Sequence, residues 1–363
     1  MHTTRKHCLL ELARAEELEA VALMPGPNLF YLTGQAFHLS ERPILGLFPV
    51  DAEPIFIVPA LEAGKLKTDR IFSYTDEAGY EGAFRDACAA LDLSDARMGV
   101  EALRMRVLES RFLAQYAPGV ALVPADRLLA RLRMLKEAEE VTAMRRAVDV
   151  AQRAFLTWLT ELRVGMTEKE AAARLVAALL TRGAEDLAFS PIVAAGPNGA
   201  LPHATPGERP FERGDWVVVD WGATVGGYRS DITRMVVFGT PTEELRAVHT
   251  VVQEANAAAR SVVAPGVTVG AVDRAARAHI EAAGYGPAFI HRTGHGLGLE
   301  AHEPPYITPG GERELEVGMT FTVEPGVYLE GRAGFRVEDD VLVTEGGVET
   351  LTTLMRDPFV LAG

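Results

Sequence analysis

The chain has 363 residues, of which 48% are hydrophobic, and carries a net charge of −14 with only two cysteines. These figures predict two domains with sizeable cores, and they exclude a disulfide framework and argue against nucleic acid as a partner. No apolar run approaches the ~18–20 residues of a membrane helix and no signal-peptide core is recognisable, so a cytoplasmic protein with no membrane partner is expected.

The first part of the chain, residues 1–125, alternates short apolar strands with helical stretches, which is typical of an α/β layer domain. A linker helix is predicted at 126–136, and a second, larger domain at 137–363. Within the first domain, strands are expected at 20–24, 44–48, 54–58, 70–74, 98–101 and 120–123, and helices at 80–91 and 106–115.

The larger domain contains an internal repeat. Apolar residues at helical spacing predict a long helix within 136–162. The segments 164–167 and 265–268, each with a glycine followed by a threonine, end one helix and cap the next. Each half is therefore helix, turn, helix and β-hairpin, and a pseudo-two-fold axis between the halves would bring both hairpins to one point.

Both hairpins carry an acid on each arm, inside apolar strands. The first is predicted to be symmetric about residues 225–226 and the second about Gly331. Acids directly opposite one another would have Cβ atoms ~4.5–5.5 Å apart, which is destabilising unless a cation neutralises them. Solvent-facing acids on ordinary hairpins are the alternative, but four acids repeated in two halves favour a pair of divalent metal ions. The opposed pairs would be Asp220 with Asp231 and Glu324 with Glu338.

Between the hairpins lies His295, surrounded by Gly294, Gly296 and Gly298. These glycines permit a close approach of the backbone, which suits a side chain aimed at a metal ion. An imidazole with carboxylates suits Mn, Co, Zn or Fe better than Ca or Mg.

At this point the chain resembles the pita-bread-fold metallopeptidases, the group that holds methionine aminopeptidase, aminopeptidase P and the Xaa-Pro dipeptidases (prolidases). The segment 27–34 also resembles the creatinase/prolidase N-terminal domain, so the likeness covers nearly the whole chain. It implies an α+β protein: a pita-bread catalytic domain at 137–363, preceded by a smaller α/β creatinase-like domain at 1–125. The matching blocks of the larger domain contain His203, Asp220, Asp231, His295, Glu324 and Glu338.

The resemblance implies a ligand set for two divalent ions per subunit, with Mn or Co expected and Zn or Fe as alternatives. Asp220 would hold one ion, Asp231 and Glu338 would bridge both, and His295 and Glu324 would complete the second. Glu324 would also carry a proton from water to the leaving nitrogen.

Other residues are expected to meet the substrate. His203 would line its pocket and His302 would donate to its carbonyl oxygen, although either could be a loop histidine without a role. Arg336 could stabilise the acidic centre or bind a substrate carboxylate, and His291 could support the site or simply pack in the core. Further candidates to read a substrate carboxylate are Arg313 and Arg332.

The function expected is hydrolysis of the Xaa-Pro bond in dipeptides. Aminopeptidase P, acting on longer Xaa-Pro peptides, is the alternative within the family. A non-catalytic binding protein or a metal-free creatinase-like enzyme is disfavoured because all five ligand positions are present. A homodimer is also expected, with loop 35–43 of one subunit reaching the other's active site; an ordinary surface loop is the alternative.

Overall fold

The computed structural model describes residues 2–362. The chain divides into two compact units, with the division between Arg133 and Met134. The division falls at the end of helix α5 (Asp126–Met134), inside the segment expected to link the domains. Among the helices of these described residues, none has both the length and the apolar content needed to cross a membrane.

The N-terminal unit is built on one mixed six-stranded sheet in the order β4-β3-β2-β1-β5-β6. All six strands expected from the sequence are present within one or two residues. The helices α3 and α4 were also expected, whereas α1 and α2 are additional. The elements are α1 (Thr3–Ala15), β1 (Ala20–Leu23), α2 (Pro27–Thr33), β2 (Leu45–Pro49), β3 (Ile55–Pro59), β4 (Ile71–Tyr74), α3 (Glu81–Leu91), β5 (Arg97–Val100), α4 (Val107–Tyr116) and β6 (Ala121–Pro124).

The first half of the larger unit opens with the predicted long helix, and its β9, β12, β8 and the distant β20 form one four-stranded sheet. Phe155 of the long helix stacks on Trp221 of the sheet, with ring centroids 4.2 Å apart, which fixes the helix on that face. The elements are α6 (Ala138–Leu159), α7 (Glu168–Thr181), β7 (Asp186–Leu187), β8 (Ile192–Ala195), β9 (Trp216–Trp221), β10 (Ala223–Val225), β11 (Tyr228–Arg229) and β12 (Ile232–Phe238).

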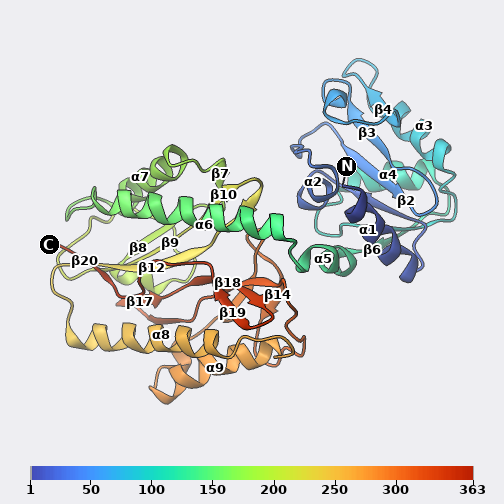
Figure 1. The fold of residues 1–363 in the computed structure, drawn as a ribbon. Helices are drawn as coiled ribbons and strands as arrows, with labels where there is room; N and C mark the ends of the chain where they lie inside the picture. The colour runs from blue at the N-terminus through green and yellow to red at the C-terminus, as the bar shows by residue number, and fades with distance from the viewer. Residues whose placement is uncertain (1, 363) are drawn as a thin grey trace. The chain divides into compact units, whose positions relative to one another are not determined.

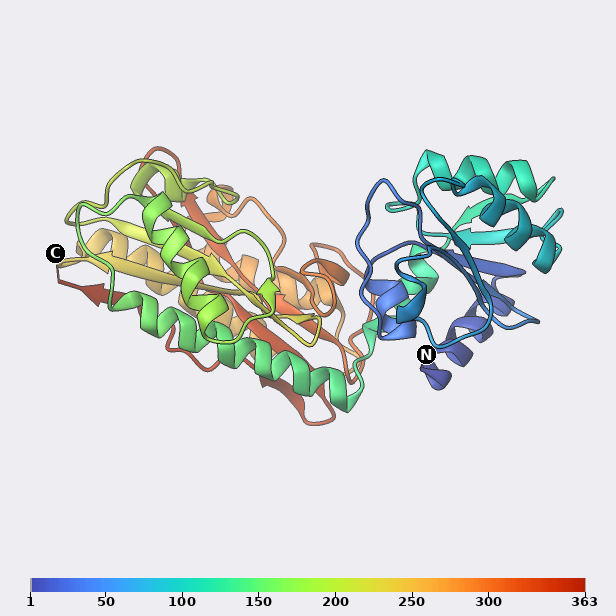
Figure 2. The ribbon, with the colours of Figure 1, turned by 90° about the horizontal axis from the view of Figure 1, so that it is seen from above.

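The second half repeats this order, and its main sheet runs β14-β13-β15-β18-β19. Helices α6 and α7 lie on one side of the strands of the unit, and α8 and α9 on the other (Figure 1). In the view from above, α6 and α7 lie in front of the strands (Figure 2). The elements are α8 (Glu243–Ser261), α9 (Val269–Ala282), β13 (Gly294–Gly296), β14 (Glu303–Ile307), β15 (Thr320–Val323), β16 (Gly326–Leu329), β17 (Ala333–Arg336), β18 (Asp339–Thr344), β19 (Gly347–Thr350) and β20 (Phe359–Leu361).

The turn between the two helices is the same in each half. Gly165 and Gly266 adopt left-handed φ values of 85° and 81°, which glycine reaches without steric cost. Thr167 and Thr268 then cap the following helices by accepting a hydrogen bond from a backbone N–H three residues on. The repeat expected from the sequence is therefore present in three dimensions.

The register of the second hairpin is as predicted, and that of the first is not. In the second, Gly326 pairs with Arg336 and Val323 with Asp339, so the intervening Glu324 and Glu338 are opposed.

In the first hairpin, Val225 pairs with Tyr228, and Asp220 pairs with Thr233. The turn is Gly226-Gly227, with φ values of 60° and 80°, as a two-residue type I′ turn requires. The expected opposition of Asp220 and Asp231 is therefore wrong by two residues. Because the slip is an even number, both acids still lie on one face.

Candidate active site

The five predicted ligand residues converge from both halves. Asp220 is the penultimate residue of β9, Asp231 directly precedes β12, and His295 lies at the centre of β13. Glu324 follows β15, and Glu338 lies between β17 and β18. Four of the five are no more than 9% exposed, so the charges lie inside the protein.

Their ligand atoms form overlapping groups, within each of which all atoms lie within 4.8 Å of one another. One group is Asp220, Asp231 and Glu338, and another is His295, Glu324 and Glu338. The Nε2 atom of His295 lies 3.2 Å from Glu324 Oε1 and 3.7 Å from Asp231 Oδ2. Glu338 is thus shared by the two groups, and Asp231 reaches the imidazole of the second.

Burial and mutual repulsion govern the charge of these acids. Burial raises the pKa of Asp231 and of Glu338 well above the usual range, and neighbouring carboxylates raise both further. Burial also raises the pKa of Asp220. Burial alone would raise the pKa of Glu324, but the hydrogen bond and charge of His295 lower it to about 2.

The residues fit divalent metal ions. Asp220 Oδ1 is buried and, within residues 2–362, has no hydrogen-bond partner. An orphaned buried carboxylate oxygen is costly unless a cation meets it. Four carboxylates and an imidazole match the ligand preferences of Mn, Co, Zn or Fe, and two divalent ions would neutralise the four acids.

Arg336 supports the acid cluster and is not available to a substrate. It is 3% exposed, and its Nη2 donates to Asp220 Oδ2 at 2.6 Å. Its Nε donates to Thr233 Oγ1 at 3.0 Å, and its Nη1 donates to the Tyr328 hydroxyl at 2.8 Å. Of the two roles expected for Arg336, these contacts favour the stabilising one over binding a substrate carboxylate.

His291 belongs to the same hydrogen-bond chain. Its Nε2 lies 2.9 Å from the Tyr328 hydroxyl, and its Nδ1 lies 2.7 Å from the backbone oxygen of Arg292. Burial lowers the pKa of His291, so the ring is neutral and donates from Nδ1 while Nε2 accepts. The chain runs from His291 through Tyr328 and Arg336 to Asp220.

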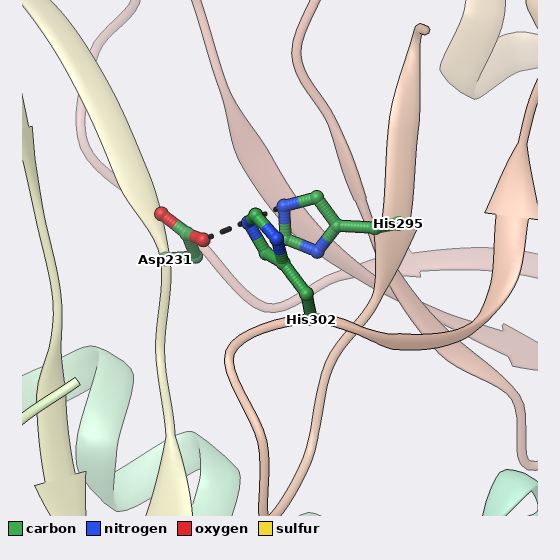
Figure 3. Close-up of side chains that lie close together, drawn as sticks. All are labelled: Asp231, His295 and His302. Carbon is green, nitrogen blue, oxygen red and sulfur yellow. Dashed lines mark ion pairs between the residues drawn. The ribbon is translucent and has the colours of Figure 1, made fainter. Parts of the chain in front are cut away.

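His302 meets the cluster at its exposed side, and His203 follows the 3₁₀ helix Gly196–Ala200 of the first half. The ring of His302 is 3.9 Å from that of His295, and a nitrogen of His302 joins Asp231 and His295 in a further compact group (Figure 3). Burial and the neighbouring His295 lower the pKa of His302 to about 4. His203 is exposed, and it contributes in a minor way to the lowered pKa of His291 and of His302.

The remaining arginine candidates lie elsewhere. Arg332 donates to Glu244 of α8 at 2.8 Å. Arg313 is exposed, and its backbone oxygen accepts from Val269 at the start of α9. Within the described chain, no contact joins either side chain to the acid cluster.

The glycines around His295 permit a close approach of the neighbouring strands. A Cβ atom on Gly294 would lie 1.8 Å from the Thr322 oxygen, and one on Gly296 would lie 2.4 Å from the Glu303 oxygen. Both glycines therefore let β13 pack between β15 and β14, which fixes the backbone that carries His295.

Two supporting residues were not predicted. Thr233 donates to Glu338 Oε2 at 2.6 Å, and Tyr328 joins Arg336 to His291. Strand periodicity could have predicted both, because residues an even number of positions apart project from the same face of a strand. Thr233 lies two residues after Asp231, and Tyr328 lies four residues after Glu324.

Comparisons with known proteins agree with this geometry. Residues 142–345 match the metallopeptidase family M24, and residues 5–135 match the creatinase/prolidase N-terminal domain. The chain is 36% identical to the probable dipeptidase PepE of Mycobacterium tuberculosis over 365 residues, or 98% of this chain and 96% of the relative.

Two solved structures are similar over nearly their whole length. The recombinant prolidase from Thermococcus sibiricus has a TM-score of 0.95 at 34% identity, covering 99% of this chain and 100% of that one. The X-Pro aminopeptidase from Thermotoga maritima has a TM-score of 0.85 at 33% identity, covering 97% and 100%.

Fold and site together define a two-domain, metal-dependent peptidase. The chain belongs to the metallopeptidase family M24. The predicted architecture, a pita-bread catalytic domain preceded by a creatinase-like N-terminal domain, is thereby confirmed.

Proposed function

We propose that this protein hydrolyses the bond before proline in Xaa-Pro dipeptides. The observation that carries the proposal is the convergence of four carboxylates and one imidazole at one point of an M24 metallopeptidase fold. The substrate class is supported by the similar proteins described as a prolidase and a probable dipeptidase.

The same residues would hold the metal ions. Asp220, Asp231 and Glu338 would hold one ion, and His295, Glu324 and Glu338 the other, with Asp231 beside both. When bound, two divalent ions would polarise the scissile carbonyl and make water acidic enough to attack at neutral pH. Mn or Co is proposed, with Zn or Fe as alternatives that the donor set also fits.

Glu324 is the residue proposed to move the proton. The proline nitrogen is a strongly basic leaving group that must be protonated as the bond breaks. Glu324 lies at the edge of the cluster, 3.2 Å from His295, and is more exposed than the other acids. It would take a proton from the attacking water and pass it to that nitrogen.

His302 and His203 would stabilise the developing negative charge on the carbonyl oxygen. With a pKa of about 4, His302 is neutral at pH 7 and offers one N–H donor. His203 is exposed on the loop after the 3₁₀ helix Gly196–Ala200 and is proposed to line the substrate pocket.

A second candidate is aminopeptidase P activity on longer peptides, favoured by the similarity to the X-Pro aminopeptidase from Thermotoga maritima. Metal-loaded protein should be compared on Gly-Pro, Gly-Pro-Ala and Gly-Ala. Faster cleavage of Gly-Pro supports the dipeptidase, and faster cleavage of Gly-Pro-Ala supports the alternative. Equal rates on Gly-Pro and Gly-Ala would defeat proline specificity but leave the metallopeptidase intact.

A homodimer in the cytoplasm is also proposed, with loop 35–43 of one subunit reaching the partner's active site. Within this loop Phe37 is only 9% exposed, and Lys65 of its own domain lies over its ring at 5.3 Å, so this side chain does not reach a partner. His38 and Leu39 are exposed and remain available to a partner. The mass in solution tests the dimer, and the KM of His38→Ala for Gly-Pro tests the loop; a strictly monomeric, fully active enzyme would exclude both.

A further inference from the structure

Arg292 is a partly buried cation whose guanidinium has no hydrogen-bond acceptor within the described residues. It lies directly before Thr293 and β13, three residues ahead of His295. Its guanidinium carbon lies 4.5 Å from the centre of the Tyr306 ring. Within residues 2–362, no carboxylate or carbonyl oxygen accepts a hydrogen bond from this guanidinium.

The strand register places Arg292 beside the acid cluster. His295 of β13 pairs with Tyr306 of β14, and paired residues of antiparallel strands project from the same face. Tyr306 is 41% exposed, so it lies at the edge of the buried site, and Arg292 lies over its ring. The charge of Arg292 also contributes to the lowered pKa of His302, whose ring contacts His295.

Other arginines of this region are already committed or lie away from the cluster. Arg336 donates to Asp220 and Tyr328, as described above. Arg277 donates to Asp273 and to the backbone oxygens of Phe289 and His291. Arg332 is paired with Glu244, and Arg313 is exposed beside α9.

We propose that Arg292 binds the C-terminal carboxylate of the dipeptide substrate, an inference that rests on the proposed dipeptidase function. A guanidinium presents a planar fork of N–H donors that matches a carboxylate bidentately, and an aromatic ring beneath it holds that plane. In a dipeptide the carboxylate lies within one residue of the scissile bond, at most about 3.5 Å along the chain. A cation beside the acid cluster therefore selects substrates whose chain ends directly after proline.

The test compares a substrate with and without its carboxylate. Wild type, Arg292→Gln and Arg313→Gln are assayed with bound metal on Gly-Pro and on Gly-Pro amide. Loss of a hydrogen bond to a charged group predicts a drop of about 10- to 100-fold in kcat/KM for wild type on the amide, and a similar drop for Arg292→Gln on Gly-Pro. Most of each loss should be in KM, because the carboxylate is bound equally before and during reaction.

The diagnostic result is non-additivity. Arg292→Gln should lose little more when the carboxylate is also removed, whereas Arg313→Gln, with the same change of charge, should behave as wild type. Arg292→Lys keeps the charge without the fork and should recover part of the activity on Gly-Pro, which also controls for folding.

Other outcomes overturn the inference. Equal losses for Arg292→Gln on both substrates, or no loss at all, would leave Arg292 only packing on Tyr306. If Arg313→Gln showed the non-additivity instead, that arginine would be the carboxylate reader. A metal-loaded wild type that cleaves no Xaa-Pro compound would overturn the proposed function itself, and with it this role.

Discussion

The two halves of the catalytic unit share a scaffold and differ in their chemistry. Val217 and Phe321 each lie three residues before the first acid of their hairpin, and they pair with Ala195 and Gly296 respectively. The residue before Gly296 is His295, so its counterpart in the first half is Ala194, a fully buried apolar residue.

The supporting side chains are just as unequal. His302, Tyr328, Arg336 and His291 all belong to the second half, whereas the first half contributes Thr233, which donates to Glu338, and the exposed His203. The repeat thus provides the four carboxylates, while the departures from the repeat provide imidazoles, hydrogen-bond donors and orientation. The acidic charge of the site therefore comes from residues that are repeated in both halves, and its histidines and hydrogen-bond donors come from residues that are not repeated.

The acids of the two halves should be equally necessary, since Asp231 and Glu338 each contact both groups of ligand atoms. Replacing either with Ala should remove both metal ions and lower activity by several orders of magnitude, while the core keeps the fold. Elemental analysis, circular dichroism and Gly-Pro turnover would measure this. Glu316→Ala, which removes an exposed acid near the start of the second hairpin, is the matched control and should be neutral. Two retained metal equivalents in either site variant would show that the shared position does not bridge.

Replacing His302 or His203 should lower the rate of hydrolysis without changing the metal content. His302→Ala and His203→Ala should keep both ions and lose about 10²–10³-fold in kcat, the usual effect of removing one oxyanion donor. One of these histidines comes from each half, so similar losses would show that both halves contact the substrate. Unchanged kinetics for either would return it to an ordinary loop histidine.

The hydrogen-bond chain from His291 to Asp220 lets the second half orient a ligand of the first. Tyr328→Phe removes the hydroxyl that joins His291 to Arg336 and should weaken metal binding by about 10–100-fold, as loss of outer hydrogen bonds does in other metal sites. Calorimetric titration with Mn²⁺ or Co²⁺ would detect it. His291→Phe should weaken binding similarly, whereas His279→Phe, an outlying histidine paired with Glu254, should not. Wild-type affinity in both chain variants would reduce His291 to core packing.

Strand content and the acid positions could be predicted from the sequence because both depend on local patterns. The six strands of the first unit are short apolar runs between polar breaks, and the second hairpin is centred on one glycine, Gly331. The first hairpin turns at Gly226-Gly227 rather than at the predicted residues 225–226. Two adjacent glycines with positive φ favour a type I′ turn, and that alone would have set the register.

Contacts between distant segments could not be predicted in the same way. Arg336 could be assigned to either of two roles, because only the folded chain brings Asp220, Thr233 and Tyr328 to its three nitrogens. The burial of Phe37 depends on a contact of the same kind, because Lys65, which lies over its ring, comes from another part of the domain. Hydrogen bonds that cross between elements carry no signature in a single sequence.

A last difference between the halves concerns acid stability. Counted from the capping residues Glu137 and Thr242, His249 of α8 occupies the helix position that Met144 occupies in α6, and both are buried. Burial lowers the pKa of His249 from 6.5 to about 4, and its Nε2 has no hydrogen-bond partner within residues 2–362. As the pH falls from 6.5 towards 4, His249 is therefore protonated in the unfolded chain but stays neutral in the folded one. The free energy of unfolding therefore carries no penalty from His249 above pH 6.5. It falls by at most about 3 kcal/mol as the pH drops from 6.5 to 4.

His249→Met places in α8 the residue that α6 has at the equivalent position, and it should remove the loss of stability that His249 causes at low pH. The difference between wild type and variant in the free energy of unfolding should shift in favour of the variant as pH falls from 7 to 4. Urea unfolding at several pH values would measure it, and subtracting the two curves cancels the carboxylates that both proteins share. His279→Met, at an outlying position on α9, is the control and should leave the wild-type pH dependence in place. A difference that stays constant with pH would mean that His249 accepts its proton in the folded protein, against the burial of its ring beside Trp216.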